Sequence, residues 1–155
     1  MRNLTLLAVM MLAATPALAM DSDANGGLAF AWHFPQKELK ESHDQGYGIH
    51  LMFAYELADK WDLSITTGWN RLLANEQPRN SPLGSDDITV WEFTAGPRLR
   101  LKWFYAGVEA GYFTKLDKWG WVPNAGVRYK ILDLGWRWNS TGESEIQTIR
   151  LGVFF

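Results

Sequence analysis

The stretch TIRLGVFF, residues 148–155, alternates polar and apolar residues up to the last position of the chain. Alternation with a period of two is typical of a β-strand with one polar and one apolar face. The termini of most soluble domains are instead polar and fray into water. We therefore expect an apolar medium to cover Ile149, Leu151, Val153 and Phe155.

Residues 1–19 have the pattern of a secretory signal peptide. A positively charged start precedes an apolar run from Leu4 to Ala14 and the small-x-small sequence Ala17-Leu18-Ala19. An apolar run of about eleven residues is too short to span a bilayer as a helix. We expect cleavage after Ala19, with a signal peptide at 1–19 and one exported domain at 20–155.

The composition excludes several function classes. Removing the first 19 of 155 residues leaves 136, with 14 Lys and Arg against 17 Asp and Glu, so we expect no nucleic-acid partner. The absence of cysteine excludes disulfides, thiolate metal sites and cysteine nucleophiles. Nine tryptophans without a long apolar run after residue 19 indicate that the apolar residues are dispersed by alternation.

Period-two alternation predicts eight strands. They cover residues 27–34, 47–57, 61–72, 88–101, 103–113, 119–131, 132–139 and 146–155. One parity of every strand is uncharged and largely apolar, as in Leu28, Phe30 and Trp32. The other parity carries the strand charges, which we expect to form one network of five acids and six bases: Glu56, Asp62, Glu92, Glu109, Asp133, Arg98, Arg100, Arg128, Lys130, Arg137 and Arg150.

Alternation alone leaves open which face is enclosed, because soluble barrels and sandwiches also alternate with their apolar face inside. Ten of the fourteen glycines lie on the polar face and none on the apolar face, and glycine marks close approach within a sheet. Long polar connections alternate with tight turns, and aromatic residues gather near both strand ends. These features favour an all-β, eight-stranded antiparallel up-and-down transmembrane β-barrel with a polar lumen.

The signal peptide, the four hairpins and the ending IRLGVFF together resemble the small eight-stranded outer-membrane barrels of Gram-negative bacteria, of the OmpX and OmpW types. The resemblance implies a location in the outer membrane, in contact with lipid and lipopolysaccharide. It also implies insertion by the barrel-assembly machinery, with Leu151, Val153 and Phe155 as the assembly signal. We expect a monomer.

Two prolines depart from the pattern. Pro97 and Pro123 lie inside predicted strands, where each removes a donor from the hydrogen-bond ladder. We expect a local bulge at each proline, or else different boundaries for the strands predicted at 88–101 and 119–131.

The lumen of an eight-stranded barrel is just wide enough for side chains, so a mutually paired network should plug it. A narrow channel is the alternative, in which Asn70, Asn124 and Thr66 would hold water. His33 and His50 share the inward face without a third ligand nearby, so we expect hydrogen-bonded histidines, no metal and no cofactor.

The segment NSTGESE, residues 139–145, superficially resembles the lipid-A acyl-hydrolase barrels through Ser140, Thr141 and Glu143. Their catalytic histidine has no counterpart here, because the neighbouring strand positions hold Trp136, Arg137 and Trp138. We expect a loop, and a protein that is not an enzyme.

The leading hypothesis is a closed, non-enzymatic barrel that acts in surface interaction, adhesion or envelope integrity through loops 35–46 and 73–87. The alternative is a narrow channel for small or hydrophobic solutes. Two further hypotheses are a lipid-A-modifying hydrolase and a soluble periplasmic lipocalin-like barrel, whose apolar face would line the interior and hold a ligand.

Overall fold

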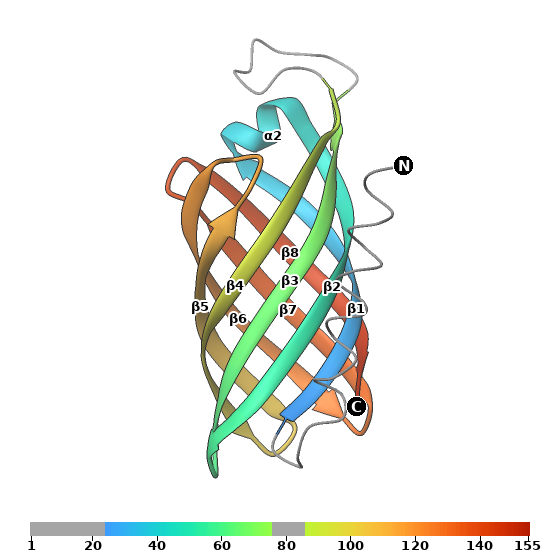
Figure 1. The fold of residues 1–155 in the computed structure, drawn as a ribbon. Helices are drawn as coiled ribbons and strands as arrows, with labels where there is room; N and C mark the ends of the chain where they lie inside the picture. Colours follow the sequence, from blue (N-terminus) through green and yellow to red (C-terminus); the bar gives the residue numbers. More distant parts are fainter. Residues whose placement is uncertain (1–23, 76–85) are drawn as a thin grey trace, which may run out of the picture.

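The computed structural model describes residues 24–75 and 86–155, which form a closed barrel of eight strands (Figure 1). The elements are β1 (Ala24–Lys37), α2 (Glu38–Ser42), β2 (His43–Ala58), β3 (Trp61–Ala74), β4 (Ile88–Leu101), β5 (Phe104–Phe113), β6 (Lys118–Tyr129), β7 (Leu132–Ser140) and β8 (Ser144–Phe154). The predicted signal peptide at 1–19 lies outside the described residues.

Each strand pairs antiparallel with the next, and β8 closes the barrel against β1, with Leu151 opposite Phe30. The backbones of Gly26 and Phe155 exchange two hydrogen bonds of 2.7 and 2.8 Å at the seam. Every backbone polar group of a membrane-spanning sheet needs such a partner, which closure alone provides. The predicted fold class is confirmed.

The two ends of the barrel differ in their connections. Two-residue turns at 59–60, 102–103 and 130–131 lie at one end, which we call the short-turn end. The opposite end, called the loop end, carries α2, the end of β3, the start of β4, and the segments 114–117 and 141–143 (Figure 1). This alternation of long and short connections agrees with the sequence prediction.

The apolar face of the sheet points outward. Phe104, Trp119 and Leu151 are 60, 74 and 60% exposed, whereas His50 and Arg137 on the other face are fully buried. An apolar belt around the whole molecule is unusual for a protein in water and suits hydrocarbon. The polar face is therefore the enclosed one.

Glycines on the inner face make room for large side chains. A Cβ atom added at Gly126 would overlap the Tyr105 side chain, and one at Gly135 would lie 2.6 Å from the Tyr105 hydroxyl oxygen. Tyr105 is 5% exposed and extends from β5 across these positions on β6 and β7. The close approach inferred from the glycine pattern is present here.

Aromatic pairs lie near both ends of the strands. Tyr47 and Trp69 have ring centroids 6.1 Å apart toward the loop end. Trp103 and Tyr129 are 5.9 Å apart at the short-turn end. Amphipathic rings at two levels match the two interfaces of a bilayer.

The first predicted loop, residues 35–46, is more ordered than expected. β1 continues to Lys37, α2 covers Glu38–Ser42, and β2 starts directly at His43. The burial of Leu39, which is 0% exposed and packs into the loop end of the barrel, stabilises this short helix. Among the described residues, no helix is long and apolar enough to cross a membrane.

The predicted bulges at Pro97 and Pro123 are wrong. The register of β4 against β5 is the same before and after Pro97, and that of β6 against β7 is the same across Pro123. On each of these sides the pairing is interrupted at the proline, while the other side remains regular, with Pro97 opposite Leu63 and Pro123 opposite Val108. An interrupted ladder thus accommodates the missing donor without an extra residue.

Candidate functional site

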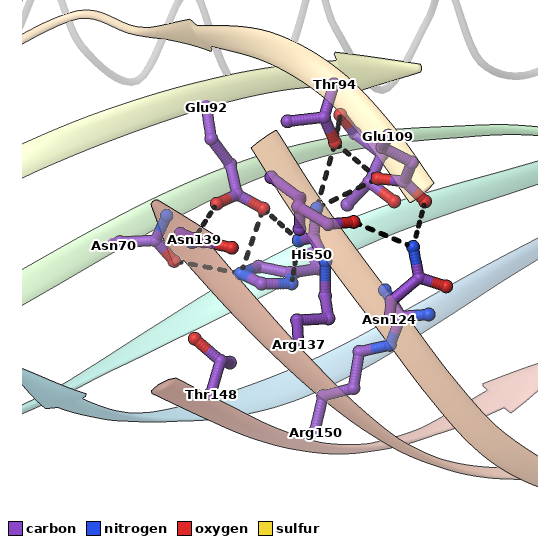
Figure 2. A network of polar contacts seen from close by, with 12 residues as sticks. His50, Asn70, Glu92, Thr94, Glu109, Asn124, Arg137, Asn139, Thr148 and Arg150 are labelled. Atoms are coloured by element: carbon purple, nitrogen blue, oxygen red, sulfur yellow. Dashed lines mark hydrogen bonds and ion pairs between the residues drawn. The ribbon is translucent and has the colours of Figure 1, made fainter. Parts of the chain in front are cut away.

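Arg137 on β7 is the centre of a buried polar network in the middle of the lumen (Figure 2). Its guanidinium forms ion pairs with Glu92 of β4 and Glu109 of β5, the second at 2.9 Å, and donates a 2.9 Å hydrogen bond to Thr94. All three charged side chains are 0 or 1% exposed. One arginine therefore ties strands from opposite sides of the barrel together.

The two carboxylates differ in their further partners. Glu109 accepts hydrogen bonds from Thr94 at 2.5 Å, from Ser64 at 2.8 Å and from Asn124 at 3.4 Å. Glu92 accepts one from Asn139 at 3.2 Å. Glu109 is held by several neutral donors, so Glu92 depends more strongly on the arginine.

The histidines extend the network toward β1. His50 donates to the Asn70 side-chain oxygen at 2.9 Å, and its Nε2 lies 3.6 Å from the Glu92 carboxylate. His33 is hydrogen-bonded to Thr148 at 2.9 Å, and the two imidazole centroids are 5.8 Å apart. Residues 24–75 and 86–155 contain no group of three or more residues that would hold a metal ion.

A second cluster lies nearer the short-turn end, around Asp133 of β7. Its carboxylate accepts hydrogen bonds from Tyr105 at 3.0 Å and from Arg128 at 3.0 and 3.1 Å, and Arg150 lies 3.8 Å away. Arg150 also donates to the Tyr105 hydroxyl at 3.3 Å. Strands β5 to β8 are joined through this single buried acid.

A third cluster joins β2, β3 and β4 at the same end. Arg98 pairs with Asp62 at 2.8 Å, and both are at most 2% exposed. Arg100 pairs with Glu56 at 2.9 Å and with Asp62 at 3.4 Å. The Glu56 side chain is 40% exposed, so this pair lies at the rim instead of inside the lumen.

Ten of the eleven residues expected in one lumen network thus lie in these three clusters, as five acids and five arginines. The eleventh residue, Lys130, lies outside the clusters, exposed in the turn between β6 and β7. In the part of the chain that the structure describes, no carboxylate lies within 4.0 Å of its ammonium group. Removing one partner of a buried pair typically destabilises a protein by about 3–5 kcal/mol, so matched numbers of charges are what a filled lumen requires.

The loop end of the lumen is apolar, which parity reasoning missed. A cluster of buried side chains points inward there and consists of Leu39, Leu72, Ile88, Val90, Phe113, Val122 and Ile146. Leu39 from α2 covers the cluster, and Figure 1 shows this helix over that end of the barrel. The sequence contained a sign of this cluster, because the inner face of several strands becomes apolar near the loop end. The polar lumen of the prediction therefore applies to the middle and short-turn end.

A buried Ser–His pair adjoins this cluster. Ser42 and His43 are hydrogen-bonded at 2.7 Å, and the other imidazole nitrogen donates to the Asp86 backbone carbonyl at 3.2 Å. Both side chains are at most 2% exposed, so a substrate does not reach them. The pair connects α2 to the start of β4 instead of forming an accessible nucleophile.

The segment 139–145, expected to be a loop, contains the end of β7, the three-residue connection 141–143 and the start of β8. Thr141 donates to the Ser144 carbonyl at 3.1 Å, and Glu143 pairs with Lys118. Neither contact supplies a base to Ser140, the candidate nucleophile.

The expected assembly-signal residues lie on the outward side of β8 and of Phe155, which directly follows it. Leu151, Val153 and Phe155 are 60, 39 and 62% exposed, whereas Phe154 points inward at 5%. Their alternation thus places three apolar side chains toward the surroundings of the barrel.

No protein-family profile and no curated protein sequence matches the chain. Among solved structures, Neisserial surface protein A superposes with a TM-score of 0.62 at 16% identity, over 86% of this chain and 96% of that one. Ail, the attachment invasion locus protein of Yersinia pestis, in complex with the heparin analogue sucrose octasulfate, gives 0.54 at 16%, over 88 and 100%. A de novo designed transmembrane β-barrel gives 0.55 at 15% identity, over 88 and 98%. These likenesses establish the fold.

Proposed function

We propose that the protein is an integral, non-enzymatic outer-membrane protein, a sealed barrel whose loop end acts in surface interaction. The filled lumen carries this proposal: the Arg137 network occupies its middle, and the apolar cluster under Leu39 closes its loop end. A barrel without a continuous polar path acts through the surfaces that it displays.

The fold neighbours support the same direction. By name, Neisserial surface protein A is a surface protein and Ail is an attachment invasion locus protein, and both superpose on this eight-stranded barrel. At 16% identity they do not transfer a partner.

The charge of the loop end favours one kind of partner. The described charged residues there are five bases and eight acids: Lys37, Lys40, Arg71, Lys115, Lys118, Glu38, Glu41, Asp44, Asp86, Asp87, Asp117, Glu143 and Glu145. An acidic surface repels sulfated sugars such as sucrose octasulfate, the heparin analogue crystallised with Ail. We propose a partner that presents basic groups.

The outward-facing residues concern the proposed contacts with the membrane. The exposed apolar belt suits contact with lipid and, at the loop end, with lipopolysaccharide. We propose that the protein is a monomer. Leu151, Val153 and Phe155 point outward at alternate positions, and we propose that the barrel-assembly machinery recognises this pattern during insertion.

A narrow channel is the second candidate. Several buried polar atoms of the lumen have no hydrogen-bond partner among the described residues, including Thr66 Oγ1, Asn124 Oδ1 and Arg150 Nη1. Unpaired polar groups below the apolar cluster are what a water-filled channel would need. Single-channel recording in planar bilayers separates the candidates: we expect no discrete conductance, and a steady one would favour the channel.

Binding by the loop end is tested with the full chain in lipid nanodiscs. Surfaces coated with polylysine or with heparin serve as basic and sulfated probes, and empty nanodiscs give the background. We expect binding to polylysine only, and a loss of it in the variant Glu38→Gln, Glu41→Gln, Asp44→Asn. The control variant Glu56→Gln, Asp59→Asn neutralises acids at the opposite end. Equal binding by both variants would refute the role of the loop end.

A further inference from the structure

A cavity opens at the short-turn end, beside the third charge cluster. Its volume is about 220 Å³, smaller than the roughly 300–1,000 Å³ of pockets for drug-sized ligands. Nine residues line it: Asp62, Arg98, Arg100, Lys102, Trp103, Phe104, Tyr105, Arg128 and Lys130. Five of these side chains are cationic and one is acidic, so the cavity suits a small anion.

The three arginines of the cavity are held in place by carboxylates. Arg98 pairs with Asp62 at 2.8 Å, Arg100 with Glu56 at 2.9 Å and Arg128 with Asp133 at 3.0 Å. These pairs neutralise the arginines and fix their orientation. The excess positive charge therefore comes from the two remaining bases.

Those two bases are lysines in neighbouring turns. Lys102 and Lys130 have no carboxylate within 4.0 Å among residues 24–75 and 86–155. Their ammonium groups lie near aromatic rings, 4.6 Å from the Trp103 centroid and 5.7 Å from the Tyr129 centroid. Both lysines are available to a ligand, and both line the cavity.

A buried donor is also without a partner at this site. Arg98 is 2% exposed, and its Nε has no hydrogen-bond partner among the described residues. Its guanidinium lies 5.0 Å from the centroid of the Tyr105 ring, which also lines the cavity. A buried N–H without a hydrogen bond is costly even when the rest of the guanidinium is paired, and an anion in the cavity that accepts this bond would relieve the cost.

The turn backbone indicates that the lysines are not there for conformational reasons. Lys102 and Lys130 have φ of 56° and 54°, in the left-handed region that glycine and asparagine adopt more readily. Lysine therefore has no conformational advantage at these two positions, and it is the cavity and its charges that favour a ligand.

We propose that this cavity binds a phosphate-bearing anion. Lysine binds phosphate as a point charge and arginine through directed N–H groups, and the cavity offers both. The nearby Trp103–Tyr129 pair places the site at the level where lipid headgroups lie. Two sources share this chemistry: the headgroup of an anionic phospholipid and free inorganic phosphate.

The test uses the full chain folded in a maltoside detergent, because phosphocholine detergents would compete. Isothermal titration calorimetry is done with inorganic phosphate, with a short-chain phosphatidylglycerol, and with the matching diacylglycerol that lacks phosphate. The site variant is Lys102→Asn with Lys130→Asn, which keeps a residue suited to positive φ. The control, Lys40→Asn with Lys115→Asn, makes the same charge change at the loop end. Boiling-dependent gel mobility verifies that each variant is folded, and the two single variants are measured as well.

We expect phosphatidylglycerol to bind and diacylglycerol not to bind. The site variant should weaken binding about tenfold or more, and added salt should weaken it further, while the control behaves as the wild type. Inorganic phosphate binding as tightly as the lipid would assign the site to the free anion. Binding that is absent, that diacylglycerol matches, or that the control variant reduces equally would overturn the proposal.

Discussion

Replacing Arg137 with methionine is the sharpest test of the lumen network. The substitution keeps much of the side-chain volume but removes the only arginine that contacts Glu92 and Glu109 in the described structure. Breaking a buried ion pair by removing one partner costs about 3–5 kcal/mol. We expect a loss of that size in the free energy of unfolding.

The structure predicts that the unpaired Glu92 accounts for more of this loss in unfolding free energy than the unpaired Glu109. Glu109 keeps donors from Thr94, Ser64 and Asn124, whereas Glu92 keeps Asn139 at 3.2 Å and a His50 nitrogen at 3.6 Å. Adding Glu92→Gln to the Arg137→Met variant should therefore recover about 2 kcal/mol or more, because it removes the poorly compensated charge. Adding Glu109→Gln should recover clearly less.

Urea titration of the full chain in phospholipid vesicles, followed by tryptophan fluorescence, measures each unfolding free energy. The double variants complete the thermodynamic cycles that isolate the pair energies. Arg71→Met serves as the control, since its pair with Asp87 at 2.9 Å is 44 and 35% exposed and should contribute about 0–1 kcal/mol. A loss below about 1 kcal/mol for Arg137→Met would refute the reasoning that the lumen charges hold the strands together.

Three further changes test other parts of the structure. Gly126→Ala should destabilise the barrel by about 1–3 kcal/mol in the same assay, because its new Cβ overlaps the Tyr105 side chain; a neutral effect would contradict this packing. Leu39→Ala should cost about 2–5 kcal/mol and speed amide exchange at the loop end only, since the side chain is fully buried there; uniform exchange changes would argue against a local seal. The pKa of Asp87 is lowered, chiefly by the hydrogen bond from the Ala74 backbone N–H, so its stabilising effect is present at neutral pH and is lost as the pH falls through the folded-state pKa. NMR titration of that carboxyl should show the low pKa, and Asp87→Asn should flatten the acid limb of the stability profile; a pKa at the ordinary value would contradict it.

The strands and their two faces were readable from the sequence. Predicted segments such as 61–72 and 88–101 match β3 and β4 closely, because a period of two needs no tertiary information. The direction of the faces followed from glycine: Gly126 and Gly135 leave the space that Tyr105 fills. Bulk composition and local period therefore sufficed for the fold class.

The loop-end seal was not predicted, although its residues were visible. Leu72, Val90 and Val122 have inward parity, but reading that face as polar concealed their apolar character. The helix α2 was also missed, because a five-residue helix has little intrinsic stability and forms here through the burial of Leu39. The predicted proline bulges are also absent. Each proline interrupts the hydrogen-bond ladder on one side of its strand, while the pairing on the other side stays in register.

The sequence by itself determined that this chain forms strands with one apolar and one polar face, and that the polar face is enclosed. Only the tertiary structure decided which charges meet: Arg137 pairs with Glu92 and Glu109 across the lumen, 45 and 28 positions away in the chain. It also separated Lys130 from that network and placed it beside Lys102 at a shared cavity. The physical reason is that alternation is a property of each strand alone, whereas partners inside a barrel depend on closure and on the register between strands.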